Sequence, residues 1–388
     1  MKNFIIWAIL LGAVGYGGSK LYLHNDICFP AQINVGEFLR VMETEKPDPG
    51  CIALGMHQNC TTCRAGQYAM VARKALDHAG LTDVPVVTSG TELRDLHPGF
   101  SIDARMQVQL LHGLAVLDAL EDLRRSTRPY ELNPGDTDAA YQAALDALCA
   151  NVANGRRSVF EVLHDAVSAF NRVPVTGEPQ RPTVLVLGEV LLALHPSSNY
   201  RLEAYLEAHG LEVLGTRLSD FFHSGFIVSR AEAQRWFENK TLLRSLVDKT
   251  CDALFVHALN SVENIMAGYV RHRPRVNART IYDTAAPWID KVHSAGEGWL
   301  ILGEIMHAAE NGVNSFVVVQ PFGCMPNHVF GRGLTHVVQE NFPHVHVLCL
   351  DFDPDTSMGN IENRLQMLIM NARELKRRRP STPSHVHA

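Results

Sequence analysis

The sequence lacks an excess of charge of either sign. Its 35 Lys and Arg residues stand against 41 Asp and Glu residues, so the formal net charge is −6. A general nucleic-acid-binding protein is normally basic, so we exclude that class. Hydrophobic residues make up 46% of the chain and charged residues 20%, a balance that excludes disordered and fibrous classes. With 388 residues, the chain can form two or three domains without depending on disulfides.

Long apolar runs are also scarce. Residues 4–14 are apolar apart from Gly12 and follow Lys2, but this run is too short to span a bilayer comfortably. No clear signal-peptide cleavage site follows it. We interpret residues 1–20 as a buried first helix or strand, or as the start of a chain derived from a larger ancestor. We therefore expect a cytoplasmic protein without membrane association.

Several nucleotide-binding and catalytic motifs are missing. The chain has no G-x-x-x-x-G-K-[ST] phosphate-binding loop and no nucleophile elbow. The glycine-rich residues 12–18 lack the preceding strand and the acidic residue of a dinucleotide-binding fingerprint. Neither paired carboxylates at helical spacing nor tandem repeats are present. The cysteines are the first indication of chemistry.

The order of the predicted elements favours an α/β fold. Residues 51–56 and 84–89 are typical of short buried strands, and residues 65–78 between them have helical periodicity. This β-α-β pattern predicts a parallel sheet. A second series follows later in the chain. It contains strands at 184–188, 211–214, 316–319 and 344–351, a helix at 198–209 capped by Ser198, and a helix at 327–341.

Helices separate the two series. Residues 102–169 have a helical pattern that is interrupted at 128–136, where Asp136 or Thr137 is expected to cap the next helix. The polar, proline-bearing stretch 174–182 is the best linker candidate. We predict two Rossmann-like parallel-sheet halves joined by a helical segment, with a cluster site between them. The predicted divisions are an apolar segment at 1–20, an α/β half at 21–100, a helical connector at 101–181, a second α/β half at 182–372 and a frayed tail at 373–388.

The eight cysteines fall into two groups. Four lie in turn-like contexts rich in Gly, Pro and Asn, and the other four are scattered. The scattered group is expected to pack as ordinary small apolar residues. The first group is Cys28, Cys60, Cys63 and Cys324, and the second is Cys51, Cys149, Cys251 and Cys349.

The first group shares one local design. Cys60, Cys63 and Cys324 come after predicted strands, at the edge of a parallel sheet where ligands bind. Cys28 precedes Pro30, which suits the first turn of a helix. A helix N-terminus therefore follows each position, and its free N–H groups and positive dipole end favour thiolates.

The spacing leaves several interpretations open. Cys60 and Cys63 form a single C-x-x-C pair, and the second pair expected of a zinc ribbon is missing. Thiols contributed singly by distant loops, Cys28 and Cys324, suit a functional [4Fe–4S] cluster better than a small structural zinc site. A redox-active dithiol is a rival interpretation, and so are buried cysteines with no chemical role.

Seven segments resemble the C-terminal part of the large activators related to 2-hydroxyacyl-CoA dehydratases. That part is also similar to the dehydratase subunits and to the double-cubane cluster proteins. The resemblance runs from about residue 20 to 370, and the segment around Cys324 is the most specific. The segments are HNDICFPA (24–31), CTTCRAGQY (60–68), RPYELNPGDTD (128–138), residues 186–213, GEGWLILGEI (296–305), QPFGCMPNHVFGRGL (320–334) and DFDP (351–354).

The resemblance implies an oxygen-sensitive [4Fe–4S] protein of anaerobic metabolism. In such systems a separate ATPase of the actin/Hsp70-like class reduces a cluster at very low potential. The cluster protein then passes the electron to a difficult substrate. In the dehydratases this is a 2-hydroxyacyl-CoA, which loses water through a ketyl radical. The fused ATPase domain of the large activators is missing from this chain.

The resemblance also implies a ligand set. Cys28, Cys63 and Cys324 match cluster ligands of the family. Cys60 is less certain, because many relatives have Gly there. As a fourth ligand it would favour electron transfer, whereas a set of three would leave one iron open to substrate.

Four other residues are weaker candidates. Glu189 and Glu304 are candidates for proton transfer, and His328 for donation to a cluster sulfur or proton movement. Arg64 is a candidate for offsetting the charge of the cluster. An ordinary structural or solvated role is the alternative for each.

The leading hypothesis is an iron–sulfur protein in ATP-driven, low-potential electron transfer to an acyl-CoA or another small substrate. Two alternatives stay open: a non-catalytic electron-transfer module that partners a separate ATPase, and a zinc-stabilised binding protein. The acyl group, the binding of CoA and the formation of a dimer are not determined by the sequence.

The missing phosphate-binding loop generates a first prediction. The purified chain alone should not hydrolyse ATP, and ATP dependence should appear only when a separate activator ATPase is added. Phosphate release measured with and without that ATPase checks this expectation. Robust turnover by the chain alone would contradict it.

Overall fold

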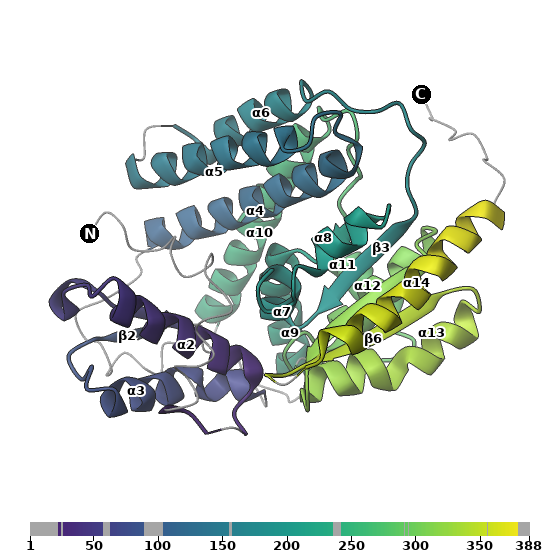
Figure 1. The fold of residues 1–388 in the computed structure, drawn as a ribbon. Coiled ribbons are helices and arrows are strands. Elements are labelled where there is room, and N and C mark those ends of the chain that lie inside the picture. Colours follow the sequence, from purple (N-terminus) through teal and green to yellow (C-terminus); the bar gives the residue numbers. More distant parts are fainter. Residues whose placement is uncertain are drawn as a thin grey trace.

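The structure is a computed structural model, and it describes residues 22–24, 26–56, 63–88, 104–154, 157–235, 242–290, 292–293, 295–354 and 356–378. It has a mixed α/β fold with two parallel sheets, which confirms the predicted α/β class, whereas the two Rossmann-like halves stay a prediction (Figure 1). The predictions for residues 1–20, for Cys60 and for the tail from residue 379 onward lie outside the described residues. Among the described helices, none is long and apolar enough to cross a membrane.

The first unit is the predicted β-α-β unit with shorter strands. Helix α2 (Phe29–Thr44) precedes β1 (Leu54–Met56), α3 (Tyr68–His78) and β2 (Val86–Thr88), and the two strands pair in parallel. The strand predicted from residue 51 begins later because Pro49–Cys51 forms a 3-10 turn, η2. Asp48 stabilises that turn by accepting a hydrogen bond from the Gly50 N–H at 3.0 Å.

The helical module forms the second part of the fold. The interruption predicted near residue 130 is confirmed, and α10, from later in the chain, shares the apolar core of α4, α5 and α6. Neither Asp136 nor Thr137 is the N-cap of α5; instead Glu131 accepts hydrogen bonds from the N–H groups of Gly135 and Thr137 at 2.9 and 2.8 Å. The module comprises α4 (Ala104–Thr127), η5 (Arg128–Tyr130), α5 (Asp136–Asn154), α6 (Val159–Phe170), α9 (Leu218–Arg235) and α10 (Leu242–Met266).

A four-stranded parallel sheet forms the third part. Its strand order is β4-β3-β5-β6, and β3 and β5 are buried along almost their whole length. All four predicted strands are present with shifted boundaries. They are β3 (Thr183–Gly188), β4 (Glu212–Gly215), β5 (Ser315–Pro321) and β6 (His346–Phe352).

Helices cover both faces of this sheet, and each face has its own apolar core (Figure 1). The first core is formed with α7 (Val190–Leu194), α8 (Leu202–Ala208) and α14 (Met358–Arg378). The second is formed with α11 (Ala278–Ala285), α12 (Trp299–Glu310) and α13 (Thr335–Asn341). The sequence did not indicate α9 to α12 individually.

Two helix predictions need correction. Ser198 does not cap a helix, because its hydroxyl contacts the ring of His195. Helix α8 begins later, at Leu202, whose N–H donates to the Asn199 side chain at 3.1 Å. The helix predicted at 327–341 is broken into three pieces. They are a π turn η6 (Asn327–Gly331), a 3-10 turn η7 (Arg332–Leu334) and α13.

The cysteines outside the candidate site are packed less uniformly than predicted. Cys349 is buried in the sheet core, as expected. Cys149 is partly exposed, and the prediction was wrong for Cys51 and Cys251, which are exposed. Cys51 ends the 3-10 turn at the surface, and Cys251 lies on the outward side of α10.

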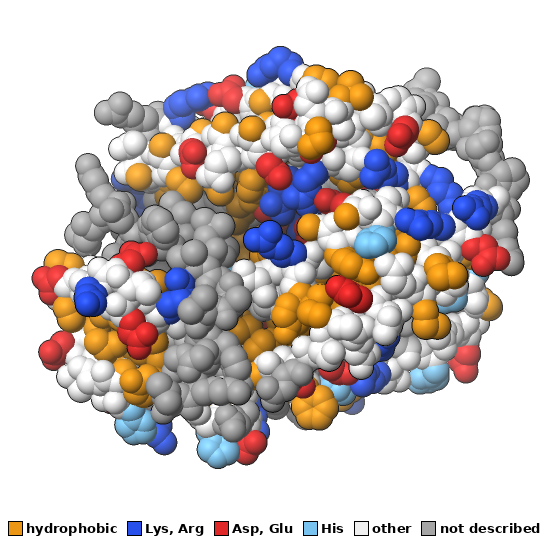
Figure 2. Space-filling model, viewed as in Figure 1, with side chains coloured by type: hydrophobic (Ala, Val, Ile, Leu, Met, Phe, Trp, Pro, Cys, Tyr) orange, Lys and Arg blue, Asp and Glu red, His pale blue; other side chains and the backbone are white. Residues whose placement is uncertain are grey.

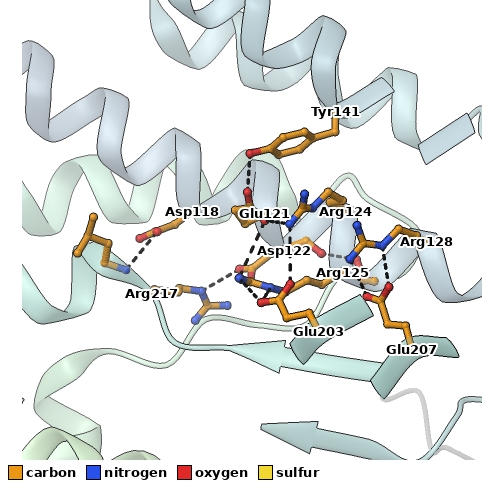
Figure 3. A network of polar contacts seen from close by, with 12 residues as sticks. Asp118, Glu121, Asp122, Arg124, Arg125, Arg128, Tyr141, Glu203, Glu207 and Arg217 are labelled. Carbon is orange, nitrogen blue, oxygen red and sulfur yellow. Dashed lines mark hydrogen bonds and ion pairs between the residues drawn. The ribbon is translucent and has the colours of Figure 1, made fainter. Parts of the chain in front are cut away.

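Ion pairs join the helical module to the sheet. Arg125 of α4 donates two hydrogen bonds to Glu203 of α8 at 3.1 and 2.8 Å, and Arg128 pairs with Glu207 at 2.7 and 3.0 Å (Figure 3). Figure 2 shows Lys and Arg side chains gathered where the module meets the sheet unit. Removing one partner of such a buried pair typically costs about 3–5 kcal/mol, so this network holds the module in place.

The close approach of β3 and β5 generates a second prediction. Gly188 has φ +127°, and a Cβ atom there would lie 2.2 Å from the Val319 carbonyl oxygen. Gly188→Ala should therefore lower the free energy of unfolding by roughly 2–5 kcal/mol, because backbone must shift. Urea unfolding measures this change. The control Gly210→Ala, which also has positive φ but no atom within 4 Å of the added Cβ, should cost about 1 kcal/mol. Equal losses in the two variants would contradict the steric argument.

Candidate metal centre

The candidate site begins where the strand order reverses. After β3 the chain adds β4 on one side, and it then crosses to add β5 on the other side. Connections that leave the carboxyl ends of β3 and β5 therefore diverge and leave a crevice, the usual ligand position in such sheets. Glu189 follows β3, and Cys324 lies a few residues after β5.

Helix α2 brings the first unit to this crevice. Its Ile33 packs in a core of the sheet, whereas Val35 and Leu39 pack against α3 and the two short strands. Cys28 is the N-cap residue of α2. The helix therefore contributes to two cores and has its N-terminal cysteine where they meet.

A side-chain hydrogen bond joins Cys28 to the second cysteine segment. The Tyr68 hydroxyl, at the first residue of α3, donates to Cys28 Sγ at 3.1 Å. Cys63 is the N-cap residue of the 3-10 turn η3 (Arg64–Gln67) immediately before Tyr68. Cys28 and Cys63 are also near enough for the charge of one to raise the pKa of the other.

The three described cysteines of the site come together around one carboxyl group. The charge of Glu189 raises the pKa of Cys28, Cys63 and Cys324, after the larger effect of burial. Such an effect weakens rapidly with distance, so each thiol lies in the neighbourhood of Glu189. Glu297 has the same effect on Cys63 and Cys324. Three thiols that are far apart in the sequence thus all lie within electrostatic reach of Glu189.

Two of these cysteines begin a helical element: Cys28 is the N-cap of α2 and Cys63 the N-cap of the 3-10 turn η3. The backbone N–H groups of Ala31, Ala65 and Asn327 lie near the thiols of Cys28, Cys63 and Cys324, respectively, and the Ala31 N–H hydrogen-bonds to the Cys28 carbonyl oxygen at 3.0 Å. These donors lower the thiol pKa, but burial outweighs them and raises the pKa of Cys28 to about 12. The thiols are therefore protonated at neutral pH, and a bound metal would have to displace their protons.

Two buried carboxyl groups complete the site. Glu189 caps α7 by accepting from the Leu192 N–H at 2.8 Å, and burial followed by the charge of Glu297 raises its pKa to about 8. Glu297 accepts from the Val190 N–H and from Asn327 Nδ2, both at 3.0 Å. Burial also raises the pKa of Glu297.

Sequence reasoning missed three residues of the site. Tyr68, Glu297 and Asn327 all lie in segments that the family resemblance quotes, and Asn327 Nδ2 also donates to Cys324 Sγ at 3.4 Å. The signal for Glu297 was its pair of flanking glycines. Gly296 has φ +57°, and an added Cβ would lie 2.8 Å from the Pro326 side chain, so only glycine fits beside the Cys324 loop.

A small pocket lies next to the thiol site. Glu297 belongs to both, because it lines the pocket and accepts from Asn327, which donates to Cys324. Thr216 and Glu304 lie on its wall with Glu297, and Phe221 and Leu194 supply apolar surface. The Thr216 hydroxyl donates to Glu304 at 2.9 Å. Burial, and next the charge of Asp220, raise the pKa of Glu304 to about 8, so this carboxyl is protonated at neutral pH.

The other predicted site residues are less closely associated with the thiols. His328 Nδ1 contacts the Cys324 carbonyl oxygen at 2.8 Å, and its Nε2 lies 3.4 Å from Asp351, which is a structural arrangement. Arg64 is exposed at the start of η3. Its role in offsetting cluster charge stays a prediction. Cys60 lies outside the described residues.

The donor set fits a thiolate-ligated cluster. Thiolates formed here would be repelled by the ionised carboxylates of Glu189 and Glu297, and a centre of cationic irons would offset that repulsion. Among the described side chains, no three of the His, Cys, Asp and Glu type are close enough to share a single metal ion. In a cubane each thiolate binds a different iron, so its ligands are spread more widely than those of one ion.

Comparison of the chain with protein-family models, with curated proteins and with solved structures finds no match. The family resemblance therefore stays a prediction.

The buried carboxyl of Glu304 generates a third prediction. The folded chain keeps this proton up to a pKa of about 8, whereas the unfolded chain releases it near 4.5. Stability should therefore fall as the pH rises through this window, by at most about 1.4 kcal/mol per pH unit for this group. Glu304→Gln should show a shallower decline in urea unfolding from pH 5 to 8. The control Glu310→Gln, at the exposed end of α12, should keep the slope of the parent, and identical slopes in all three chains would contradict the assignment.

Proposed function

We propose that this chain is an iron–sulfur protein that takes part in low-potential electron transfer to a small substrate. One observation carries the proposal: Cys28, Cys63 and Cys324, from three separate segments, all lie within electrostatic reach of Glu189, which follows β3 where the strand order reverses. Ligands bind at this edge of a parallel sheet, and two of the thiols accept hydrogen bonds, from Tyr68 and from Asn327.

The proposed ligands of a [4Fe–4S] cluster are these three cysteines. Cys60 is the proposed fourth ligand, because it is separated from Cys63 by only two residues and its added entropic cost is small. When bound, the cluster would supply one electron at low potential to a nearby substrate. The backbone N–H groups of Ala31 and Asn327 would stabilise the bound thiolates.

The adjoining pocket, at about 10 Å³, has room for one water molecule, so it supports proton transfer beside the cluster. Glu304 and Glu297 border it, and both carry raised pKa values. A carboxyl that keeps its proton at neutral pH can donate it through such a water to a substrate oxygen, and Glu304 is held for this by Thr216.

The resemblance supports the remaining parts of the proposal. A separate actin/Hsp70-like ATPase would reduce the cluster, and an acyl-CoA is the favoured substrate class. An electron-transfer module without its own substrate would share the cysteines but would not need Glu304. An assay of dehydration or reduction with the reduced ATPase partner therefore distinguishes the two functions.

Metal analysis of anaerobically purified chain gives the fourth prediction. We expect a brown protein with about four irons and four sulfides per chain. Colourless protein with stoichiometric zinc would support a zinc-stabilised binding protein instead. Iron-free and zinc-free protein would contradict both.

Single cysteine variants sharpen this measurement. Cys28→Ser, Cys63→Ser and Cys324→Ser should each lose most of the iron and sulfide, because serine is a poor replacement for thiolate in such clusters. The matched control is Cys251→Ser, at an exposed position on α10, which should keep the metal content of the parent. Full iron content in all three site variants would rule out the proposed ligand set.

A further inference from the structure

Tyr68 is placed to act on two of the proposed ligands at once. Its hydroxyl donates to Cys28 Sγ at 3.1 Å, and its backbone directly follows the 3-10 turn that begins at Cys63. The side chain is only 9% exposed, so water does not compete strongly for the phenol proton. Tyr68 therefore fixes the sulfur of one cysteine relative to the segment that carries the other.

The hydrogen bond changes in strength with the state of the sulfur. A neutral thiol is a weak acceptor, whereas a thiolate bound to a metal carries negative charge and accepts a stronger, charge-assisted bond. A buried phenol directed at a thiol therefore gains most when Cys28 is a ligand. The Tyr68 hydroxyl is directed at the Cys28 sulfur, as outer-shell partners of metal ligands are.

Hydrogen bonds to cluster sulfurs also affect redox chemistry. Reduction adds negative charge to the cluster and its thiolates, so a donor stabilises the reduced form more than the oxidised form. Asn327 makes a similar contact with Cys324, but its amide also donates to Glu297, so a substitution there alters two contacts. The single proton of Tyr68 offers a cleaner probe.

We propose that Tyr68 is a positioning residue that holds the Cys28 sulfur and raises the reduction potential of the cluster. This inference rests on the proposed function, because it requires a cluster at these cysteines. The proposed role depends on the Tyr68 hydroxyl and not on the packing of its ring.

The test compares reduction potentials measured by EPR-monitored redox titration of anaerobic protein. Tyr68→Phe keeps the ring and removes the donor, so the potential should become more negative while iron and sulfide stay at the parent level. The matched control is Tyr269→Phe, which removes a buried hydroxyl that contacts Thr127 at 2.7 Å in the helical module. Its potential should equal that of the parent.

Replacement of Tyr68 by 3-fluorotyrosine gives a second, independent measurement. This phenol is a stronger donor of nearly the same shape, so the potential should shift in the opposite direction, to less negative values. If Tyr68→Phe does not retain a cluster, the potential of the 3-fluorotyrosine protein decides whether the Tyr68 hydroxyl affects the cluster.

The outcomes separate the two proposals. A loaded cluster whose potential is unchanged in both Tyr68 variants would overturn the role of Tyr68 and leave the proposed function intact. A parent chain that binds no iron under anaerobic reconstitution would overturn the proposed function, and the role of Tyr68 with it.

Discussion

The reversal of strand order between β3 and β5 is the constraint on which the rest of the site depends. Gly188 lies so close to β5 that no larger residue fits, and the Glu189 N–H donates to the Val319 carbonyl at 2.9 Å. The two strands therefore stay paired to their carboxyl ends, and the connections diverge only beyond that point. Glu189 and the Cys324 loop emerge there, so both lie at the edge where a ligand can enter.

Packing of α2 supplies the second half of the site. Because the same helix buries Ile33 in the sheet core and Leu39 in the first unit, the two units cannot separate without exposing apolar surface of both. The helix N-terminus, with Cys28, is thereby held near the crevice. The ion pairs of Arg125 and Arg128 hold the helical module against the sheet unit in a similar way.

Electrostatics give the site its chemical character. Three thiols and two carboxyls lie in partly buried positions, and burial raises the pKa of every one of them. Tyr68 and Asn327 donate hydrogen bonds to two of the sulfurs. Burial disfavours isolated anions in this region, so the proposed cluster, with its cationic irons, would stabilise the thiolates that bind it.

The sequence by itself determined the α/β class, the strands of both sheets and the helix that begins after Cys28, because these depend on local apolar periodicity and on proline position. It also identified the cysteines by their place between strands and helices. Only the tertiary structure decided that Ser198 contacts His195, that α10 joins the helical module, and that Glu297 and Tyr68 belong to the site. The physical reason is that these contacts join side chains whose neighbours are set by packing: Tyr68 meets Cys28 across 40 residues of chain because α2 and α3 share one core, and no local pattern records that packing.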